Sequence, residues 1–260
     1  MAFENITYEK KDKIGWVTIN RPEAMNVLNM ATILEMEKAL DNIEKDEDVW
    51  VGIITGAGEK AFSAGADLKE VGKLDFVWNM NYSKACHRVF GKIEEMGKPF
   101  IAGINGLAIG GGFELILACP LRVMSEKAHL SFPELGLGAI PGAGGTQRLS
   151  RLIGKSRAIW YTLTGERMDA RTALNIGLVH KVVAPELVHG ECEELASLIC
   201  QKGPFAARLA LEAINSGAEI DLDNALRLET ALMGLASLSE DAKEGIQAVM
   251  GKRPPNFKGR

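Results

Sequence analysis

Two glutamates in apolar, glycine-rich surroundings are the first candidates for chemistry in this 260-residue chain. Glu114 lies in the segment Gly110-Gly-Gly-Phe-Glu-Leu115, and Glu134 follows a proline at the start of a glycine-rich stretch. A glutamate among apolar residues is normally exposed or paired, because burying its charge without compensation is costly. Together the two could act as a general acid and base. The alternative is that each caps a helix or forms a local salt bridge, for example with Arg148 or Arg122.

Two loops of small residues could supply hydrogen-bond donors beside these carboxyl groups. One is Ala64-Gly-Ala-Asp67, and the other is Gly110-Gly-Gly112, which opens an apolar helical run. Peptide N–H groups at the start of a helix have no intrahelical partner, so they suit an anion or an oxygen that becomes one during a reaction. An N–H from each loop, converging on one oxygen, would form an oxyanion hole. The alternative is that the glycines serve a tight turn or close backbone packing.

Alternating strands and helices are expected to position these loops. Residues 14–19, 49–55 and 99–104 have the composition of strands, and residues 29–45 and 76–96 carry apolar side chains at helical spacing. This alternation predicts an α/β core, whose ligands usually bind where strands end. From about residue 187 the pattern is helical throughout, with an irregular basic tail after Gly251. We expect a core with the active site over residues 1–200 and a helical oligomerisation region over 201–260.

Composition and charge exclude several classes of protein. A net charge of −4 and a pI near 5.7 argue against a nucleic-acid partner. The most apolar run, residues 100–121, contains five glycines and Glu114, so a membrane span is not expected. The N-terminus has no secretory pattern. The four cysteines show no metal-ligand spacing, which predicts reduced thiols, a cytoplasmic location and no metal site.

Taken together and in order, the motifs of this chain resemble the enoyl-CoA hydratase (crotonase) family. The segments that carry the resemblance cover essentially the whole chain: Thr18-Ile-Asn-Arg-Pro22, Asn26-Val-Leu-Asn29, Ala64-Gly-Ala-Asp67, Asn105-Gly106, Gly110-Gly-Gly-Phe-Glu114, Pro133-Glu134, Ile140-Pro-Gly-Ala-Gly-Gly-Thr-Gln-Arg148, Leu163-Thr-Gly165 and Gly177-Leu-Val179. The resemblance implies a crotonase-type spiral of ββα units with a helical C-terminal trimerisation region. It also implies a trimer or a dimer of trimers, the homohexamer.

The resemblance implies an activity as well: reversible syn addition of water to a 2-enoyl-CoA, giving a 3-hydroxyacyl-CoA, as in the β-oxidation of fatty acids. The partner would be an acyl-CoA thioester, and no cofactor would be needed beyond the coenzyme A of the substrate. The N–H groups of Ala66 and Gly111 would form the oxyanion hole, and Glu114 and Glu134 would be catalytic. The substrate-binding positions would be Ala24, Ala64, Ala66, Asp67, Leu68, Lys69 and Gly142.

Departures from the family pattern bear on the substrate. Glu23 stands where many relatives have a lysine, which removes one possible phosphate contact. Phe132 replaces a common glutamine, and it could narrow or dry the acyl pocket; Pro120 replaces a common aspartate.

Two kinds of alternative stay open. An enoyl-CoA isomerase needs one base, so retention of both glutamates favours a hydratase; other acyl-CoA enzymes of the superfamily generally rearrange these positions. An RNA-binding relative or an inactive scaffold is a different class. The acidic helix after Asn29 speaks against RNA.

Overall fold

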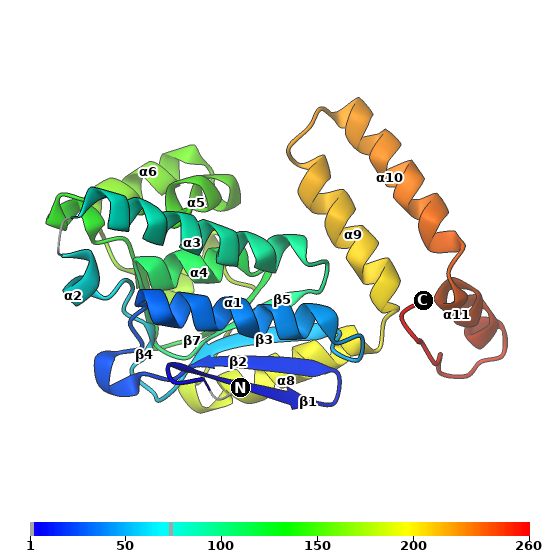
Figure 1. Ribbon diagram of the computed structural model, residues 1–260. Helices are drawn as coiled ribbons and strands as arrows, with labels where there is room; N and C mark the ends of the chain where they lie inside the picture. The colour runs from blue at the N-terminus through cyan, green and yellow to red at the C-terminus, as the bar shows by residue number, and fades with distance from the viewer. Residues whose placement is uncertain (1–2, 73–74) are drawn as a thin grey trace.

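The computed structural model describes residues 3–72 and 75–260 and has the mixed α/β architecture expected from the sequence (Figure 1). The strands are β1 Ile6–Lys11, β2 Ile14–Ile19, β3 Val51–Gly56, β4 Ala61–Ser63, β5 Phe100–Ile104, β6 Leu107–Ile109, β7 Leu121–Ser125, β8 His129–Ser131, β9 Met168–Asp169 and β10 Lys181–Val183. The helices are α1 Met30–Lys45, α2 Leu68–Val71, α3 Phe76–Glu95, α4 Gly111–Ala118, α5 Gly145–Ile153, α6 Lys155–Thr164, α7 Ala170–Asn175, α8 Val188–Cys200, α9 Pro204–Gly217, α10 Leu222–Ser237 and α11 Glu240–Met250. Short 3-10 turns lie at η1 Pro22–Ala24, η2 Glu134–Leu137 and η3 Pro185–Leu187.

The chain winds as a spiral that feeds two sheets. The larger sheet has the order β1-β2-β3-β5-β7-β10, and the smaller has the order β4-β6-β8-β9. Each turn adds one strand to the large sheet and one short strand to the small sheet, as β3 with β4, β5 with β6 and β7 with β8. Apart from the β1–β2 pair, the large sheet is parallel. This confirms the spiral of ββα units that the family resemblance implies.

Burial explains why the local patterns became these elements. Every residue of β3 and β5 is buried, which is expected of strands covered on both faces of a parallel sheet. In α1 the apolar stripe that includes Ile33, Met36 and Leu40 is fully buried. Asn29 is the N-cap of α1: its side chain accepts a hydrogen bond from the Thr32 N–H at 2.8 Å. The helix therefore begins and ends where the sequence places it.

The helices cover the large sheet on both sides. α1 packs on β1 and β2 and against α3, while α8 packs on β3, β5 and β7. Cys192 of α8 is buried in that second contact, and Cys86 and Cys119 are buried in the main core. All four cysteines are free thiols, as expected.

The last three helices leave the core. α9 and α10 form an antiparallel pair that stands away from the sheets, with α11 beyond it (Figure 1). The tail after α11 folds back: the carboxylate of Asp241 accepts hydrogen bonds from the N–H groups of Lys258 and Gly259, at 2.7 and 2.9 Å. Phe257 then packs against the cluster around Trp50.

No helix in the described parts of the chain is long and apolar enough to cross a membrane.

Candidate active site

One apolar cavity of about 430 Å³ brings together most of the residues singled out from the sequence. The predicted site residues in its wall are Ala64, Ala66, Leu68, Gly111, Glu114, Glu134 and Gly142. They come from the loop after β4, the start of α4, the turn η2 and the loop before α5. The two glutamates, 20 positions apart in the sequence, therefore share one cavity.

The loop after β4 is pinned to the segment that precedes α1. The Leu28 N–H donates to the Gly65 carbonyl at 2.7 Å, and the Asp67 N–H donates to the Leu28 carbonyl at 3.1 Å. Gly65 has a φ of +88°, and a Cβ there would lie 2.7 Å from the Ile109 carbonyl oxygen. Only glycine fits this close approach of the two loops. The N–H of Ala66 forms no hydrogen bond within the described chain.

Gly111 is the first residue of α4 and lies directly opposite this loop. A Cβ built on Gly111 would stand 3.6 Å from the nitrogen of Ala66. Like the Ala66 N–H, the Gly111 N–H has no acceptor among the described residues, as expected at the first position of a helix. The next residue, Gly112, packs so tightly that a Cβ would lie 2.4 Å from the Ser63 carbonyl oxygen. Two unpaired peptide donors thus border the same small space, and an oxygen placed there would meet both.

Glu114 is buried in the first turn of α4 and is held by backbone groups. Its Oε1 accepts hydrogen bonds from the N–H groups of Ala143 and Gly145, at 2.7 and 2.8 Å. Burial raises the pKa of Glu114, and the two N–H donors oppose this by stabilising the ionised form. The alternative of a salt bridge to Arg148 or Arg122 is wrong: Arg148 pairs with another glutamate, and Arg122 binds backbone carbonyls.

Glu134 begins η2 in a different environment. Its Oε2 is buried without a hydrogen-bond partner. Burial, together with the negative charge of Glu114, raises the pKa of Glu134 to about 7. A Cβ on Gly110 would lie 2.7 Å from Glu134 Oε1, so the carboxyl group packs directly on the start of α4. The two carboxyl groups thus differ in proton affinity for identifiable reasons, the pattern expected of an acid and a base.

Three predicted substrate-binding positions lie outside the cavity wall. Asp67 caps α2 through the Lys69 N–H at 3.1 Å and forms an ion pair with Arg21 at 3.3 Å. Lys69 itself is exposed on α2, and Ala24 lies in η1. The carboxylate of Asp67 therefore organises the loop rather than facing the cavity.

One wall of the cavity, contributed by α3, was not identified from the sequence. Asn79, Tyr82 and Ser83 line it. The Tyr82 hydroxyl donates to the Leu28 carbonyl at 2.8 Å, and the Ser83 hydroxyl donates to the Gly142 carbonyl at 2.5 Å. The Oδ1 of Asn79 is buried without a partner in the described chain. Their spacing of three and four residues places them on one helix face, and this was the available signal.

Phe132 does not border the cavity, contrary to the suggestion that it narrows the acyl pocket. Its fully buried ring stacks on Phe113, with ring centroids 4.5 Å apart. It lies behind the loop that holds Glu114, since a Cβ on Gly145 would come within 2.6 Å of it. Its effect on the site is therefore exerted through this loop.

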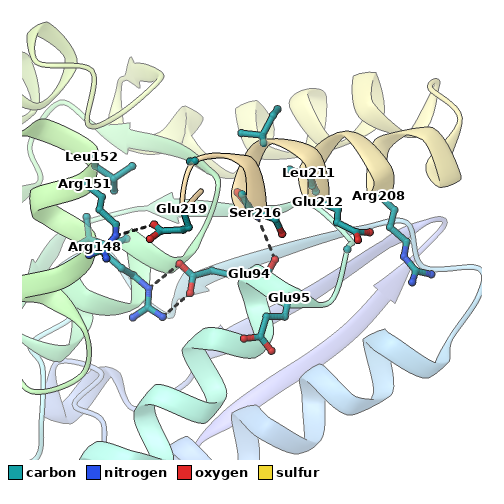
Figure 2. Close-up of a pocket in the computed structure, with 15 residues that line it drawn as sticks. Glu94, Glu95, Arg148, Arg151, Leu152, Arg208, Leu211, Glu212, Ser216 and Glu219 are labelled. Atoms are coloured by element: carbon teal, nitrogen blue, oxygen red, sulfur yellow. Dashed lines mark hydrogen bonds and ion pairs between the residues drawn. The ribbon is translucent and has the colours of Figure 1, made fainter. Parts of the chain in front are cut away.

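A second hollow, of about 950 Å³, lies between α3, α5 and α9 (Figure 2). Its central charges are already paired: Arg148 with Glu94 at 2.6 Å and Arg151 with Glu219 at 2.9 Å. It does not contain the two carboxyl groups of the apolar cavity. In the described residues no group of three or more His, Cys, Asp or Glu side chains could hold a metal ion.

Comparisons with known proteins agree over the whole chain. The model of the enoyl-CoA hydratase/isomerase family matches residues 9–260. A short-chain-enoyl-CoA hydratase of Clostridium acetobutylicum is 41% identical over 100% of both chains, and a crotonyl-CoA hydratase of Syntrophomonas wolfei is 43% identical over 99% of both. The crystal structure of an enoyl-CoA hydratase from Bacillus anthracis superposes with a TM-score of 0.96 at 40% identity, covering 99% of this chain and 100% of that one.

Proposed function

The chain belongs to the enoyl-CoA hydratase/isomerase family and is an enoyl-CoA hydratase, and from this premise we propose how its residues divide the reaction. Addition of water to a 2-enoyl thioester places negative charge on the thioester oxygen as the enolate forms. The N–H groups of Ala66 and Gly111 donate hydrogen bonds to that oxygen. Each preorganised donor of this kind contributes roughly 2.7–4 kcal/mol to transition-state stabilisation.

Glu114 activates the water and Glu134 delivers the proton to Cα. The observation that carries this assignment is that two buried carboxyl groups with different hydrogen-bond partners line one apolar cavity. Glu114 accepts two backbone N–H groups, which favour the carboxylate needed in a base. Glu134 has a pKa raised to about 7, and its Oε2 has no hydrogen-bond partner among the described residues. Both features suit a group that carries a proton near neutral pH. In the reverse reaction, dehydration, the two exchange roles.

The coenzyme A moiety is proposed to leave the cavity past the loop 64–69. Ala64, Ala66 and Leu68 border the cavity, and Leu68 is 61% exposed at its rim. Asp67, Lys69 and Ala24 lie beyond it, where backbone groups and the lysine can meet the adenosine diphosphate. Nothing in this chemistry requires a metal or a redox cofactor, because the thioester itself supplies the electron-withdrawing group.

The acyl chain is proposed to be short. The cavity of about 430 Å³, bounded by the two carboxyl groups, has to hold the thioester and the attacking water as well as the acyl tail, which limits the length of that tail. Gly142 and Ala143 border the space where the water and the acyl group meet. Two relatives more than 40% identical to this chain act, by their names, on short-chain enoyl-CoA and crotonyl-CoA.

We propose a homo-oligomer with threefold symmetry, a trimer or a dimer of trimers, assembled through residues 201–260. The helices α10 and α11 expose many large apolar side chains, more than a monomer normally leaves in water. The most exposed are Leu222, Met233, Leu238, Ile246, Val249 and Met250. Light scattering should give a mass of three or six chains. A stable 28.1 kDa particle at micromolar concentration would contradict the proposal.

A cytoplasmic role in fatty-acid β-oxidation is proposed alongside. It is supported by the four free thiols, which persist in a reducing compartment, and by the enoyl thioester as substrate.

The decisive experiment is hydration of crotonyl-CoA by the wild type, Glu114→Gln, Glu134→Gln and the double variant, with ligand binding measured separately. Glutamine preserves size and one acceptor, so binding should persist. Each single variant should lose on the order of 10²–10⁴-fold in kcat. The double variant should be far less than additively worse, since the two groups act as a unit. Full hydration by Glu114→Gln would overturn the two-carboxylate assignment.

A further inference from the structure

We propose that Arg148, clamped by Glu94, is a positioning residue that fixes the orientation of Glu114 from behind the active site. The inference rests on the proposed role of Glu114 as the base. Neither Arg148 nor Glu94 borders the apolar cavity. Both line the second hollow instead (Figure 2).

The guanidinium of Arg148 is held at three points. Its Nε and Nη2 donate to the two carboxylate oxygens of Glu94, at 2.8 and 2.6 Å, in a forked ion pair that links α5 to α3. Its Nη1 donates to the carbonyl oxygen of Ala143 at 3.1 Å. The side chain is only 16% exposed, so water screens these contacts little.

The carbonyl that Arg148 holds lies between the two donors of Glu114. The Ala143 N–H and the Gly145 N–H both donate to Glu114 Oε1, and the Ala143 carbonyl belongs to the peptide unit between them. The two N–H groups belong to the peptide units on either side of it. A displacement of the Ala143 or Gly144 Cα that carried this carbonyl away from Arg148 would therefore also move the adjoining N–H group. Arg148 therefore restrains the backbone on which the direction of the Glu114 carboxylate depends.

Gly144 shows how closely the guanidinium fits this loop. Its φ is +105°, and a Cβ there would lie 2.0 Å from Arg148 Nη1. A side chain at position 144 would therefore displace the guanidinium from its present place. The loop thus has the one residue type that lets the arginine reach the Ala143 carbonyl.

The charge of Arg148 acts in the same direction as its geometry. The ionisable groups around Glu114 are Tyr82 and Cys86 from α3, Glu134 from η2 and Arg148 from α5. Of these, Arg148 is the one cation, and it lowers the pKa of Glu114 against the effect of burial. Its removal should raise that pKa, so the active carboxylate would be lost at a higher pH.

Arg151 provides a matched control one helical turn away. It projects into the same hollow and pairs with Glu219 at 2.9 Å (Figure 2). Both partners are more than half exposed, and the other hydrogen bonds of Arg151 go to Gln147 rather than to the loop that holds Glu114. Loss of this pair should leave the chemistry unchanged.

The test compares Arg148→Gln, Arg148→Lys, Glu94→Gln and the control Arg151→Gln in crotonyl-CoA hydration across pH. Binding of butyryl-CoA, the saturated thioester that cannot be hydrated, is measured in parallel. Arg148→Gln should lower kcat by roughly 10–100-fold, because small misplacements of a catalytic group have effects of this size. It should shift the acid limb of the pH profile of kcat, the range where kcat falls as pH is lowered, to higher pH. The affinity for butyryl-CoA should stay within about twofold of the wild-type value.

Arg148→Lys keeps the charge but loses the fork, so its acid limb should return toward that of the wild type while kcat stays low. Glu94→Gln should lower kcat less than Arg148→Gln, and Arg151→Gln should match the wild type. Wild-type kcat and acid limb in folded Arg148→Gln would overturn the inference. So would an equal loss of kcat and butyryl-CoA binding with an unshifted limb.

If Arg148→Gln does not fold, kcat and butyryl-CoA binding of Arg148→Lys and Glu94→Gln decide: kcat should fall in both with binding kept, and wild-type kcat in both would overturn the inference. Glu114→Gln separates the two proposals. Normal hydration by that variant would refute the base assignment itself, whereas inactive Glu114→Gln beside a normal Arg148→Gln refutes only the positioning role.

Discussion

Gly111→Ala should abolish most turnover while leaving the fold intact. The added Cβ would meet the Ala66 nitrogen and a Leu28 methyl at 3.6 Å, and the Gly65 carbonyl carbon at 3.8 Å. All three are ordinary van der Waals distances, so nothing has to move in the free protein. Because alanine is preferred to glycine in helices by roughly 0.5–1 kcal/mol, the melting temperature should not fall.

The same methyl group narrows the space between the two donors. An oxyanion must come within about 2.7–3.1 Å of its donors, and the Cβ would be only 3.6 Å from the Ala66 nitrogen. We therefore expect it to push the oxygen away from at least one N–H. Loss of one donor is worth roughly 2.7–4 kcal/mol, which predicts a fall in kcat of about 10²–10³-fold. The larger Gly111→Val should abolish turnover.

The assay is crotonyl-CoA hydration, followed by loss of absorbance of the conjugated double bond, alongside thermal unfolding. Gly136→Ala is the control, since a Cβ there has nothing within 4 Å and the residue lies in η2 beside the site. It should behave as the wild type. A folded Gly111→Ala enzyme with normal kcat would show that the Gly111 N–H does not bind the thioester oxygen.

Three further predictions concern the carboxyl groups and the acyl wall. With a pKa of about 7, Glu134 is protonated below that pH; kcat/KM for hydration should therefore fall as pH rises through 7, and an unchanged basic limb in Glu134→Gln would refute the assignment. Asn79→Leu removes a buried, unpartnered amide oxygen, so the kcat/KM ratio of octenoyl-CoA to crotonyl-CoA should rise about 10-fold, and an unaltered ratio would contradict this. Gly145→Ala would place a Cβ 2.6 Å from the Phe132 ring and 2.9 Å from Glu114 Oε1, so both the melting temperature and kcat should fall. A wild-type value of either would show that the loop can move to accommodate the methyl group.

Local patterns in the sequence were enough to predict the long elements and to mark the two carboxylates as candidates. The apolar stripe of α1 and the Asn29 cap specify that helix, because helical periodicity and N-capping depend on neighbours only a few residues away. The fully apolar runs of β3 and β5 predict strands covered on both faces. Glu114 and Glu134 were identifiable because a charged side chain is unusual in apolar, glycine-rich surroundings.

Only the tertiary structure decided what surrounds those carboxylates. The short strands β4, β6, β8 and β9 have two or three residues each, too few to carry a pattern, and they exist through pairing between distant segments. The donors at Ala66, Gly111, Ala143 and Gly145 are backbone N–H groups, which every residue but proline has; no side chain marks them. Arg148 was a possible partner of Glu114 on charge alone, but in the fold it forms its ion pair with Glu94 of α3 instead. Which donor meets which acceptor is set by the contact of remote segments, and that information is not local in the chain.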